Sequence, residues 1–355
     1  MKILIATDLH IHPFPEFAHT TKDGLSSRLV EGLDTLKWLS ETITNEGCKD
    51  FWFLGDLFHV PGVVRTQTYS WAAPLIHEIA GKVEDGGLWL LGNHDIFDRH
   101  SHVLKPFEKS ICVISEPTTF DYDEFLIGAV PYIDNHEEMQ FEIEKMCEIF
   151  KSESRPGILL IHCILNHVIV GSTGFVIKNA IEVDPDRLNE FTMILGGDVH
   201  RGQMNGNVWY LGSTLKHTFN DAEQWGYAWI LDTDTMKMDQ IPNPHSPLFI
   251  KRTEGDPEQI AGEVTDHTAA VYHIYLSLEG PEKWINAVKD AIPQEIRPQV
   301  GIRGLPTDSS QEFIVRSQIS MNSDAIETIE TFGALKGWPK KVIERGIEIF
   351  KETQR

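Results

Sequence analysis

Five short polar motifs, each placed directly after an apolar run, constrain the fold of this 355-residue chain more than any other feature. In open α/β sheets the carboxyl ends of the strands border one crevice, and ligands bind in that crevice. Motifs that follow different strands can therefore converge on one site although they lie far apart along the chain. In chain order they are Asp8-Leu9-His10, Gly55-Asp56-Leu57-Phe58-His59, Gly92-Asn93-His94-Asp95, His162 and Gly197-Asp198-Val199-His200.

The apolar runs have the lengths of buried strands. Most are bounded by Gly, Asp or Asn, which is typical of strands covered on both faces. Leucine or isoleucine recurs every three or four residues from Leu25 to Ile43 and predicts a helix there, and similar patterns predict helices over 67–82 and 137–153. The alternation of strand and helix predicts a layered α/β fold. The predicted strands are Ile3–Ala6, Phe51–Leu54, Leu88–Leu91, Phe125–Val130, Ile158–Ile161, Met193–Leu195, Val208–Leu211 and Tyr227–Leu231.

A proline-rich segment over residues 242–247 interrupts this alternation and is our predicted domain boundary. We expect a large α/β domain over 1–244, a small α+β domain containing a β-α-β unit over 245–320, and C-terminal helices over 321–355. The elements expected after the boundary are a strand over Val271–Leu278, a helix over Pro281–Ala291, a strand near 299–303, and terminal helices that begin at an Asn322/Ser323 cap and at Pro339.

The motif side chains are carboxylates, imidazoles and one amide. Such donors suit Mn²⁺, Mg²⁺ or Fe²⁺, and Zn²⁺ to a lesser degree. A shared carboxylate can bridge two cations about 3.5–4 Å apart, and such a pair makes hydroxide from water near neutral pH and polarises phosphoryl oxygens. Taken singly, Asp8 with His10 has a simpler explanation as a capped loop, and His162 as a core histidine. The ordered set of all five motifs favours a metal site.

The order D-x-H, G-D, G-N-H-D, H and G-D-x-H resembles that of the calcineurin-like metallophosphoesterase superfamily, over the larger, N-terminal part of the chain. The resemblance implies a β-sandwich flanked by helices and two bound divalent cations. Within the superfamily the chain resembles the SbcD-type DNA recombination and repair nucleases. The features that it shares with them are His59 in the second motif, the block Tyr210-Leu211-Gly212-Ser213-Thr214 with Phe219 and Trp225-Gly226-Tyr227, and a small domain with terminal helices similar to their capping domain and ATPase-binding tail.

The resemblance implies a role for each motif side chain. The first cation would be bound by Asp8, His10, Asp56 and His200, and the second by Asp56, Asn93, His162 and Asp198, so that Asp56 bridges the two. His94 would contact the scissile phosphate and protonate the leaving oxygen, and Asp95 would orient the His94 ring. His59 would help to position the phosphate.

Asp198 departs from the superfamily pattern, which usually has His at this position. A carboxylate there still binds a hard cation through oxygen, but it adds negative charge to the site. We therefore expect Mn²⁺, with Mg²⁺ as the alternative, rather than Zn²⁺.

The activity that the resemblance implies is that of a metal-dependent DNA nuclease, with 3′→5′ exonuclease activity on double strands and endonuclease activity on single strands. The chain has no G-x-x-x-x-G-K-[S/T] motif, so ATP hydrolysis would belong to a separate SMC-like coiled-coil ATPase. A homodimer is also implied. Two alternatives stay open: a generic phosphatase or small phosphodiesterase, and a catalytically inactive scaffold with the same fold, which only Asp198 supports.

The net charge limits how such a chain could bind DNA. With 31 Lys and Arg against 53 Asp and Glu, the net charge of −22 argues against binding DNA by surface charge alone, and the ATPase could supply the basic DNA track. The 4 cysteines form no CxxC pair and predict free thiols in a reducing compartment. Since no apolar stretch approaches membrane-spanning length, we expect a cytoplasmic protein of a bacterial cell, or a phage protein that acts in the host cytoplasm.

Overall fold

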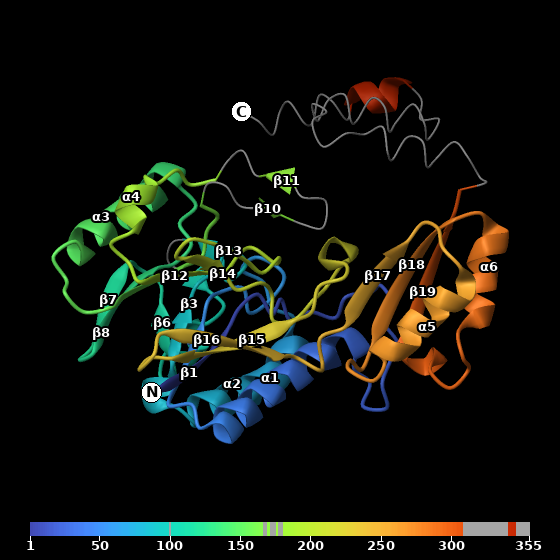
Figure 1. Ribbon diagram of the computed structural model, residues 1–355, viewed down its shortest axis with the longest axis horizontal. Coiled ribbons are helices and arrows are strands. Elements are labelled where there is room, and N and C mark those ends of the chain that lie inside the picture. Colours follow the sequence, from blue (N-terminus) through green and yellow to red (C-terminus); the bar gives the residue numbers. More distant parts are fainter. Residues whose placement is uncertain (99–100, 166–168, 171–174, 177–179, 308–339, 346–355) are drawn as a thin grey trace.

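Two six-stranded sheets face each other in the computed structural model, which describes residues 1–98, 101–165, 169–170, 175–176, 180–307 and 340–345 (Figure 1). The first sheet has the strand order β16-β15-β1-β2-β3-β6, and the second has the order β13-β14-β12-β9-β8-β7. The strands of the first sheet are β1 (Lys2–Ala6), β2 (Asp50–Phe53), β3 (Leu88–Leu90), β6 (Cys112–Ile114), β15 (Tyr227–Asp232) and β16 (Lys237–Pro242). Those of the second are β7 (Thr118–Tyr122), β8 (Phe125–Val130), β9 (Gly157–Ile161), β12 (Met193–Gly196), β13 (Gln203–Asn205) and β14 (Val208–Tyr210).

Helices cover the outer face of each sheet because the central strands carry apolar side chains on both faces. On β1, Ile3 and Ile5 pack between the two sheets, whereas Leu4 belongs to the core formed with α1 and α2. Helices α3 and α4 cover the second sheet in the same way. The layers therefore run helix, sheet, sheet, helix, and the layered α/β fold is confirmed. The four helices are α1 (Ser27–Glu46), α2 (Thr66–Ala80), α3 (His136–Phe150) and α4 (Pro185–Leu188).

All eight predicted strands overlap strands of these two sheets, and the three predicted helices correspond to α1, α2 and α3. The four strands of these sheets that the sequence did not predict are β6, β7, β13 and β16, which are the edge strands. An edge strand is short or has a solvent-facing side, so its sequence lacks the continuous apolar run of a central strand.

Parallel pairing brings the carboxyl ends of the motif-bearing strands to one edge of the sandwich. Strands β1, β2 and β3 are parallel neighbours in the first sheet, and β9 and β12 are parallel neighbours in the second. Backbone hydrogen bonds join the loops that follow: Asp8 N–H donates to the Gly55 carbonyl oxygen (3.0 Å), and Gly197 N–H donates to the Ile161 carbonyl oxygen (3.0 Å). The fold thus collects all five motifs at one place.

A third sheet, parallel and three-stranded, follows the proline-rich segment. The predicted strand-helix-strand unit corresponds to β18, α6 and β19, whereas β17 and α5 were not predicted. Helix α5 buries only Ile260, Ala261 and Val264, which is a weak periodic signal. The elements are β17 (Leu248–Arg252), α5 (Pro257–His267), β18 (Ile274–Gly280), α6 (Glu282–Ala291) and β19 (Val300–Pro306).

Most residues of the predicted C-terminal helices lie outside the described part of the chain. Residues 340–345 are described, and they are helical. Within the described ranges, none of the helices combines the length and the apolar character needed to cross a bilayer.

The third sheet contacts helix α1 through a buried polar network. The Arg28 guanidinium lies over the rings of Phe249 and Tyr275 and forms an ion pair with Glu31 (2.7 Å). The Tyr275 hydroxyl donates to Glu31 Oε1 (2.5 Å), and the Phe17 ring stacks on the Tyr275 ring. These contacts fix the third sheet against the first domain near the motif-bearing loops.

Replacing Trp52 tests the packing between the two sheets. Trp52 is fully buried there, and its indole N–H donates to Asp50 Oδ2 (2.9 Å). Because truncation leaves a cavity, we expect Trp52→Ala to lower the free energy of unfolding by about 3–5 kcal/mol in chemical denaturation. Trp71→Ala is the control, since Trp71 on α2 is 48% exposed. Equal losses in the two variants would contradict this account of the core.

Candidate metal centre

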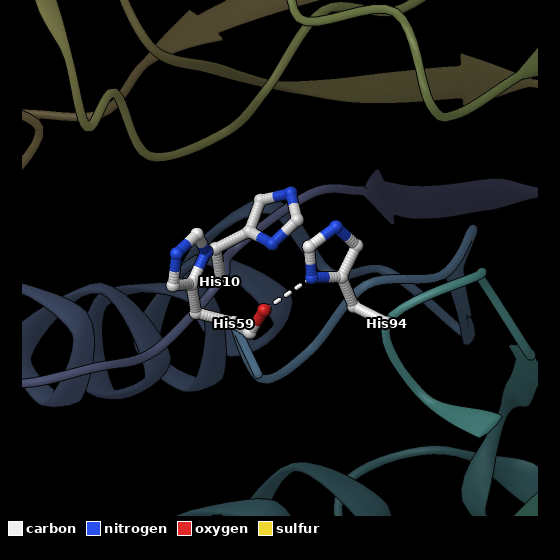
Figure 2. Close-up of side chains that lie close together, drawn as sticks. All are labelled: His10, His59 and His94. Atoms are coloured by element: carbon white, nitrogen blue, oxygen red, sulfur yellow. Dashed lines mark hydrogen bonds between the residues drawn. The ribbon is translucent and has the colours of Figure 1, made fainter. Parts of the chain in front are cut away.

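The side chains of all five motifs gather where the two sheets present their strand ends. The residues that follow β1, β2 and β3 face those that follow β9 and β12, and Figure 2 shows the rings of His10, His59 and His94 turned toward one another. Among the described residues, three groups have ligand atoms that lie within 4.8 Å of one another. These groups are Asp8 with His10 and His200, Asp8 with Asp56 and His162, and His10 with His59 and His94.

Asp56 lies at the centre of the cluster. Its Oδ2 atom is 3.4 Å from His10 Nε2 and 3.5 Å from His162 Nε2. The same Nε2 atom of His162 lies 3.2 Å from Asn93 Oδ1. The Asp56 carboxylate therefore lies between the imidazoles of His10 and His162, where a ligand that bridges two cations would lie.

His200 and Asp198 complete the cluster from the second sheet. His200 Nε2 lies 3.1 Å from His10 Nε2 and 4.0 Å from Asp8 Oδ1. Asp198 N–H donates to Asp8 Oδ1 (3.2 Å), but the Asp198 carboxylate belongs to none of the three close groups of described residues. Asp198 therefore contacts the cluster through its backbone, and its half-buried carboxylate lies at the margin.

The backbone of the cluster is strained at four non-glycine residues. The φ angles of Asp8, His10, Asp56 and Asp198 are 54°, 41°, 62° and 73°, in the left-handed region. Each such conformation costs about 1–3 kcal/mol and persists only where the surrounding structure fixes it, which is typical of functional sites. The strain favours a role in function for these four positions over one in packing.

Two motif glycines leave the space that the site needs. A Cβ atom on Gly92 would lie 2.2 Å from Asp56 Oδ1, and one on Gly197 would lie 2.7 Å from His162 Nδ1. Any side chain at either position would displace a carboxylate or an imidazole of the cluster. The glycines in the motifs are thus required by close approach of the chain to the site.

The electrostatics of the cluster favour a bound cation. Burial raises the pKa of Asp8 to about 6 and also raises the pKa of Asp198. Burial opposes ionisation of Asp56 as well, but the neighbouring His162 and His94 lower its pKa overall. The pKa of His162 is well above its usual range, because the attraction of Asp56 and Asp8 outweighs burial. These oxygen and imidazole donors around excess buried negative charge fit divalent cations.

Asp95 has different partners from those expected. Its carboxylate accepts from the backbone N–H groups of Asp56 (2.7 Å), Leu57 (3.0 Å) and Gly92 (3.0 Å), not from the His94 ring. The expectation that Asp95 orients the His94 ring is therefore wrong, because its oxygens are occupied by the loop that carries Asp56. Burial and the nearby Asp56 raise the pKa of Asp95 to about 7.

His94 and His59 form one wall of the cluster. His94 Nδ1 contacts the carbonyl oxygen of His59, and the two rings are stacked with their centroids 5.5 Å apart (Figure 2). His94 N–H donates to Asp56 Oδ1 (2.8 Å). Nδ1 of His59 is buried without a hydrogen-bond partner.

Three buried polar residues beside the cluster were not predicted as site residues. The Asp221 carboxylate lies 3.2 Å from His200 Nδ1, and Lys216 Nζ donates to the His200 carbonyl oxygen (2.6 Å). The His217 ring lies 5.6 Å from that of His10. Their only sequence signal was the block around Phe219, which marked the segment but gave no role to these residues.

A groove of about 1130 Å³ borders the cluster at Asn93. Its lining includes Tyr132 and the exposed ring of Phe97, together with the acidic residues Asp134 and Glu138. The groove is large enough for a nucleotide, and the acidic wall limits how much additional negative charge it accepts.

A model of the calcineurin-like phosphoesterase family matches residues 1–202, which contain all five motifs. The chain belongs to this family. The resemblance seen in the motifs is thereby confirmed, and with it the use of divalent metal ions and of phosphoester substrates that the family name denotes.

Two curated phage proteins are similar to this member of the family. One is "Exonuclease subunit 1" of Enterobacteria phage T4, 24% identical over 235 residues that make up 59% of this chain and 61% of that protein. The other is "Probable exonuclease subunit 1" of Escherichia phage T5, 24% identical over 224 residues, or 61% of this chain and 62% of that protein. The chain matches about three fifths of the length of these relatives.

Solved structures of phosphoesterases are also similar to the chain. An archaeal phosphodiesterase is 13% identical with a TM-score of 0.35, and the match covers 68% of this chain and 99% of the other. A dimetal phosphatase from Danio rerio is 9% identical with a TM-score of 0.44, and the match covers 68% and 96% of the two chains.

Replacing Asp8 tests the electrostatic need for a cation. A carboxyl whose folded pKa is raised above its unfolded value contributes stability at low pH and loses it as the pH rises through the folded pKa. With the pKa of Asp8 raised from 3.8 to about 6, metal-free wild-type protein loses this contribution as the pH rises from about 4 to about 7. We expect Asp8→Asn to gain about 2–3 kcal/mol relative to wild type over that range in denaturation experiments with chelator.

Added Mn²⁺ provides the control. At about 100 times its dissociation constant, a bound ion stabilises the wild-type fold by about 2.7 kcal/mol, and we expect Asp8→Asn to gain less. A difference between variant and wild type that is independent of both pH and Mn²⁺ would refute this electrostatic account.

Proposed function

We propose that this protein is a metal-dependent DNA nuclease and the nuclease subunit of a complex with an SMC-like coiled-coil ATPase. The observation that carries the proposal is the position of Asp56, whose Oδ2 lies within 3.5 Å of the imidazoles of both His10 and His162. The names of the phage relatives, which are exonuclease subunits, support DNA as the substrate and a complex as the working form. The third sheet beside the site supports a polymeric substrate, since a minimal phosphatase needs no second domain.

We propose the two ligand sets that the family resemblance implies. Asp8, His10, Asp56 and His200 would hold the first cation, and Asp56, Asn93, His162 and Asp198 would hold the second. His162 Nδ1 is 2.6 Å from the Leu54 carbonyl oxygen, which leaves Nε2 for the cation. We propose Mn²⁺ as the preferred ion, with Mg²⁺ as the alternative, because the Asp198 carboxylate is a hard oxygen donor.

With both cations bound, the centre would supply a water of lowered pKa and polarise the phosphoryl oxygens. The chain's own residues would position the phosphate and protonate the leaving oxygen. His59 and His94 lie where the phosphate would enter, and His94 Nδ1 is already engaged with the His59 carbonyl oxygen. His94 would donate a proton from Nε2 to the leaving oxygen, and His59 would help to position the phosphate. Asp95 would act by holding the loop of Asp56.

The acidity of the chain bears on its partners. Because the net charge is −22, the basic track for the DNA backbone would come from the ATPase.

We propose 3′→5′ exonuclease activity on double strands, endonuclease activity on single strands, and a homodimer as the assembly. Residues 245–320 would act as a DNA-binding capping domain after a nuclease domain over 1–244, and 321–355 as the ATPase-binding tail. The activity would take place in the cytoplasm of a bacterial cell, in DNA recombination, repair or replication, with a cellular or phage gene as its source.

An assay on end-labelled DNA tests this function. We expect purified protein to degrade duplex ends in Mn²⁺, to do so more slowly in Mg²⁺, and to stop when chelator is added. Asp56→Ala should lower the rate by about 10³-fold or more, because the bridging carboxylate supports both cations and several kcal/mol of transition-state stabilisation depend on them. Asp239→Ala, at an exposed position on β16, is the control and should keep the wild-type rate.

Comparing three substrates separates the alternatives. Turnover of bis-p-nitrophenyl phosphate or a nucleoside phosphate, with intact DNA in the presence and absence of the ATPase, would establish a phosphatase or small phosphodiesterase instead. No turnover of any substrate, with no Mn²⁺ bound, would establish an inactive scaffold.

A further inference from the structure

Lys216 and Asp221 are buried charges that no part of the proposed mechanism uses. Their exposures are 1% and 2%; Lys216 precedes the short helical turn η3 (Phe219–Asp221), and Asp221 is its last residue. Burying a charge is unfavourable unless it is paired and hydrogen-bonded, so each needs a specific partner. The contacts of both residues converge on His200.

The Asp221 carboxylate is fixed through both of its oxygens. Oδ2 accepts from the backbone N–H groups of His217 (3.2 Å) and Thr218 (3.1 Å). Oδ1 lies 3.2 Å from His200 Nδ1. A carboxylate only accepts hydrogen bonds, so His200 must carry a proton on Nδ1, which leaves its Nε2 atom facing His10 and Asp8.

Lys216 holds the backbone of the same histidine. Its ammonium donates to the His200 carbonyl oxygen (2.6 Å), and Ser213 N–H donates to that oxygen as well (3.2 Å). Lys216 is itself held by a hydrogen bond from its N–H to Ser246 Oγ (3.0 Å). The segment 213–221 thus contacts both the ring and the main chain of His200.

His200 needs such support more than the other histidines of the cluster. Its side chain is 35% exposed, whereas those of His10 and His162 are 4% and 0% exposed. Packing encloses the rings of His10 and His162 almost completely, whereas the partly exposed ring of His200 has fewer packing contacts to fix its orientation. A histidine that binds a metal commonly donates its second N–H to a carboxylate that sets the orientation of the ring.

We propose that Asp221 and Lys216 are positioning residues that hold His200 Nε2 toward the first cation, Asp221 through the ring and Lys216 through the backbone. This inference rests on the proposed function, because it takes His200 as a metal ligand. It predicts that the two cation sites respond differently to changes at Asp221.

Asp221→Asn is the sharpest variant. The amide oxygen can still accept from the N–H groups of His217 and Thr218, while the NH₂ group faces His200 Nδ1. That donor favours the tautomer with the proton on Nε2, the nitrogen that should bind the cation. We expect calorimetric titration of the full chain with MnCl₂ to show one of two sites weakened by about 10–100-fold and the other unchanged. ¹⁵N NMR of metal-free protein should show the His200 proton moving from Nδ1 to Nε2.

Asp50→Asn is the matched control. Asp50 is also a buried aspartate that accepts hydrogen bonds, from Trp52 Nε1 and the Tyr122 hydroxyl, but it lies at the opposite end of β2 from Asp56. We expect this variant to lose stability without any change in Mn²⁺ affinity. Should Asp221→Asn fail to fold, Lys216→Met decides, since it removes the amine at similar length and should weaken the same single site.

The outcomes separate this inference from the proposed function. Mn²⁺ binding by Asp221→Asn that matches wild type, or equal weakening of both sites, would overturn the positioning role while wild-type binding and nuclease activity stand. Wild-type protein that binds no Mn²⁺ would overturn the proposed function itself and the inference with it.

Discussion

The gathering of buried carboxylates where the parallel central strands of two sheets end is the constraint on which the rest of this structure depends. Asp8, Asp56 and Asp95 are at most 2% exposed and lie close enough for each charge to oppose ionisation of the next. Imidazoles and backbone N–H groups of the surrounding loops offset this electrostatic cost. Asp8 and Asp56 themselves have left-handed backbone conformations. Such an arrangement is unfavourable as packing and understandable as a site for cations.

The sequence was most informative where local chemistry and strand periodicity coincide. Central strands show as apolar runs, and the motifs follow them, so the fold class and the gathering of the five motifs could both be predicted. Edge strands were missed because their exposed sides dilute the apolar signal. The same holds for β17 and α5, whose short apolar segments resemble those of many loops.

Contacts between distant segments could not be predicted in this way. The pairing of Asp221 with His200 and the hydrogen bonds that Asp95 accepts from the loop of Asp56 depend on how side chains are oriented after folding. The resemblance implied that Asp95 orients His94, yet in the structure the Asp95 carboxylate accepts hydrogen bonds from the backbone of the Asp56 loop. For Lys216 the nearby block around Phe219 gave no role, since a lone lysine in a sequence is most simply explained as a surface residue.

The site and the surrounding fold divide the work of the proposed nuclease. The two sheets fix the chemistry, while the third sheet contacts α1 through Arg28 and Tyr275 and so lies within reach of the loops that border the site. The net charge of −22 opposes binding of the DNA backbone by surface charge alone, which fits the partner that we propose.

The most direct test of the central claim is a crystal structure of the full chain grown with Mn²⁺, with data collected at the manganese absorption edge. We predict two anomalous peaks that share the Asp56 carboxylate, one beside His10 and His200 and the other beside Asn93 and His162. No peak within the cluster, or a single ion that does not contact Asp56, would contradict the account.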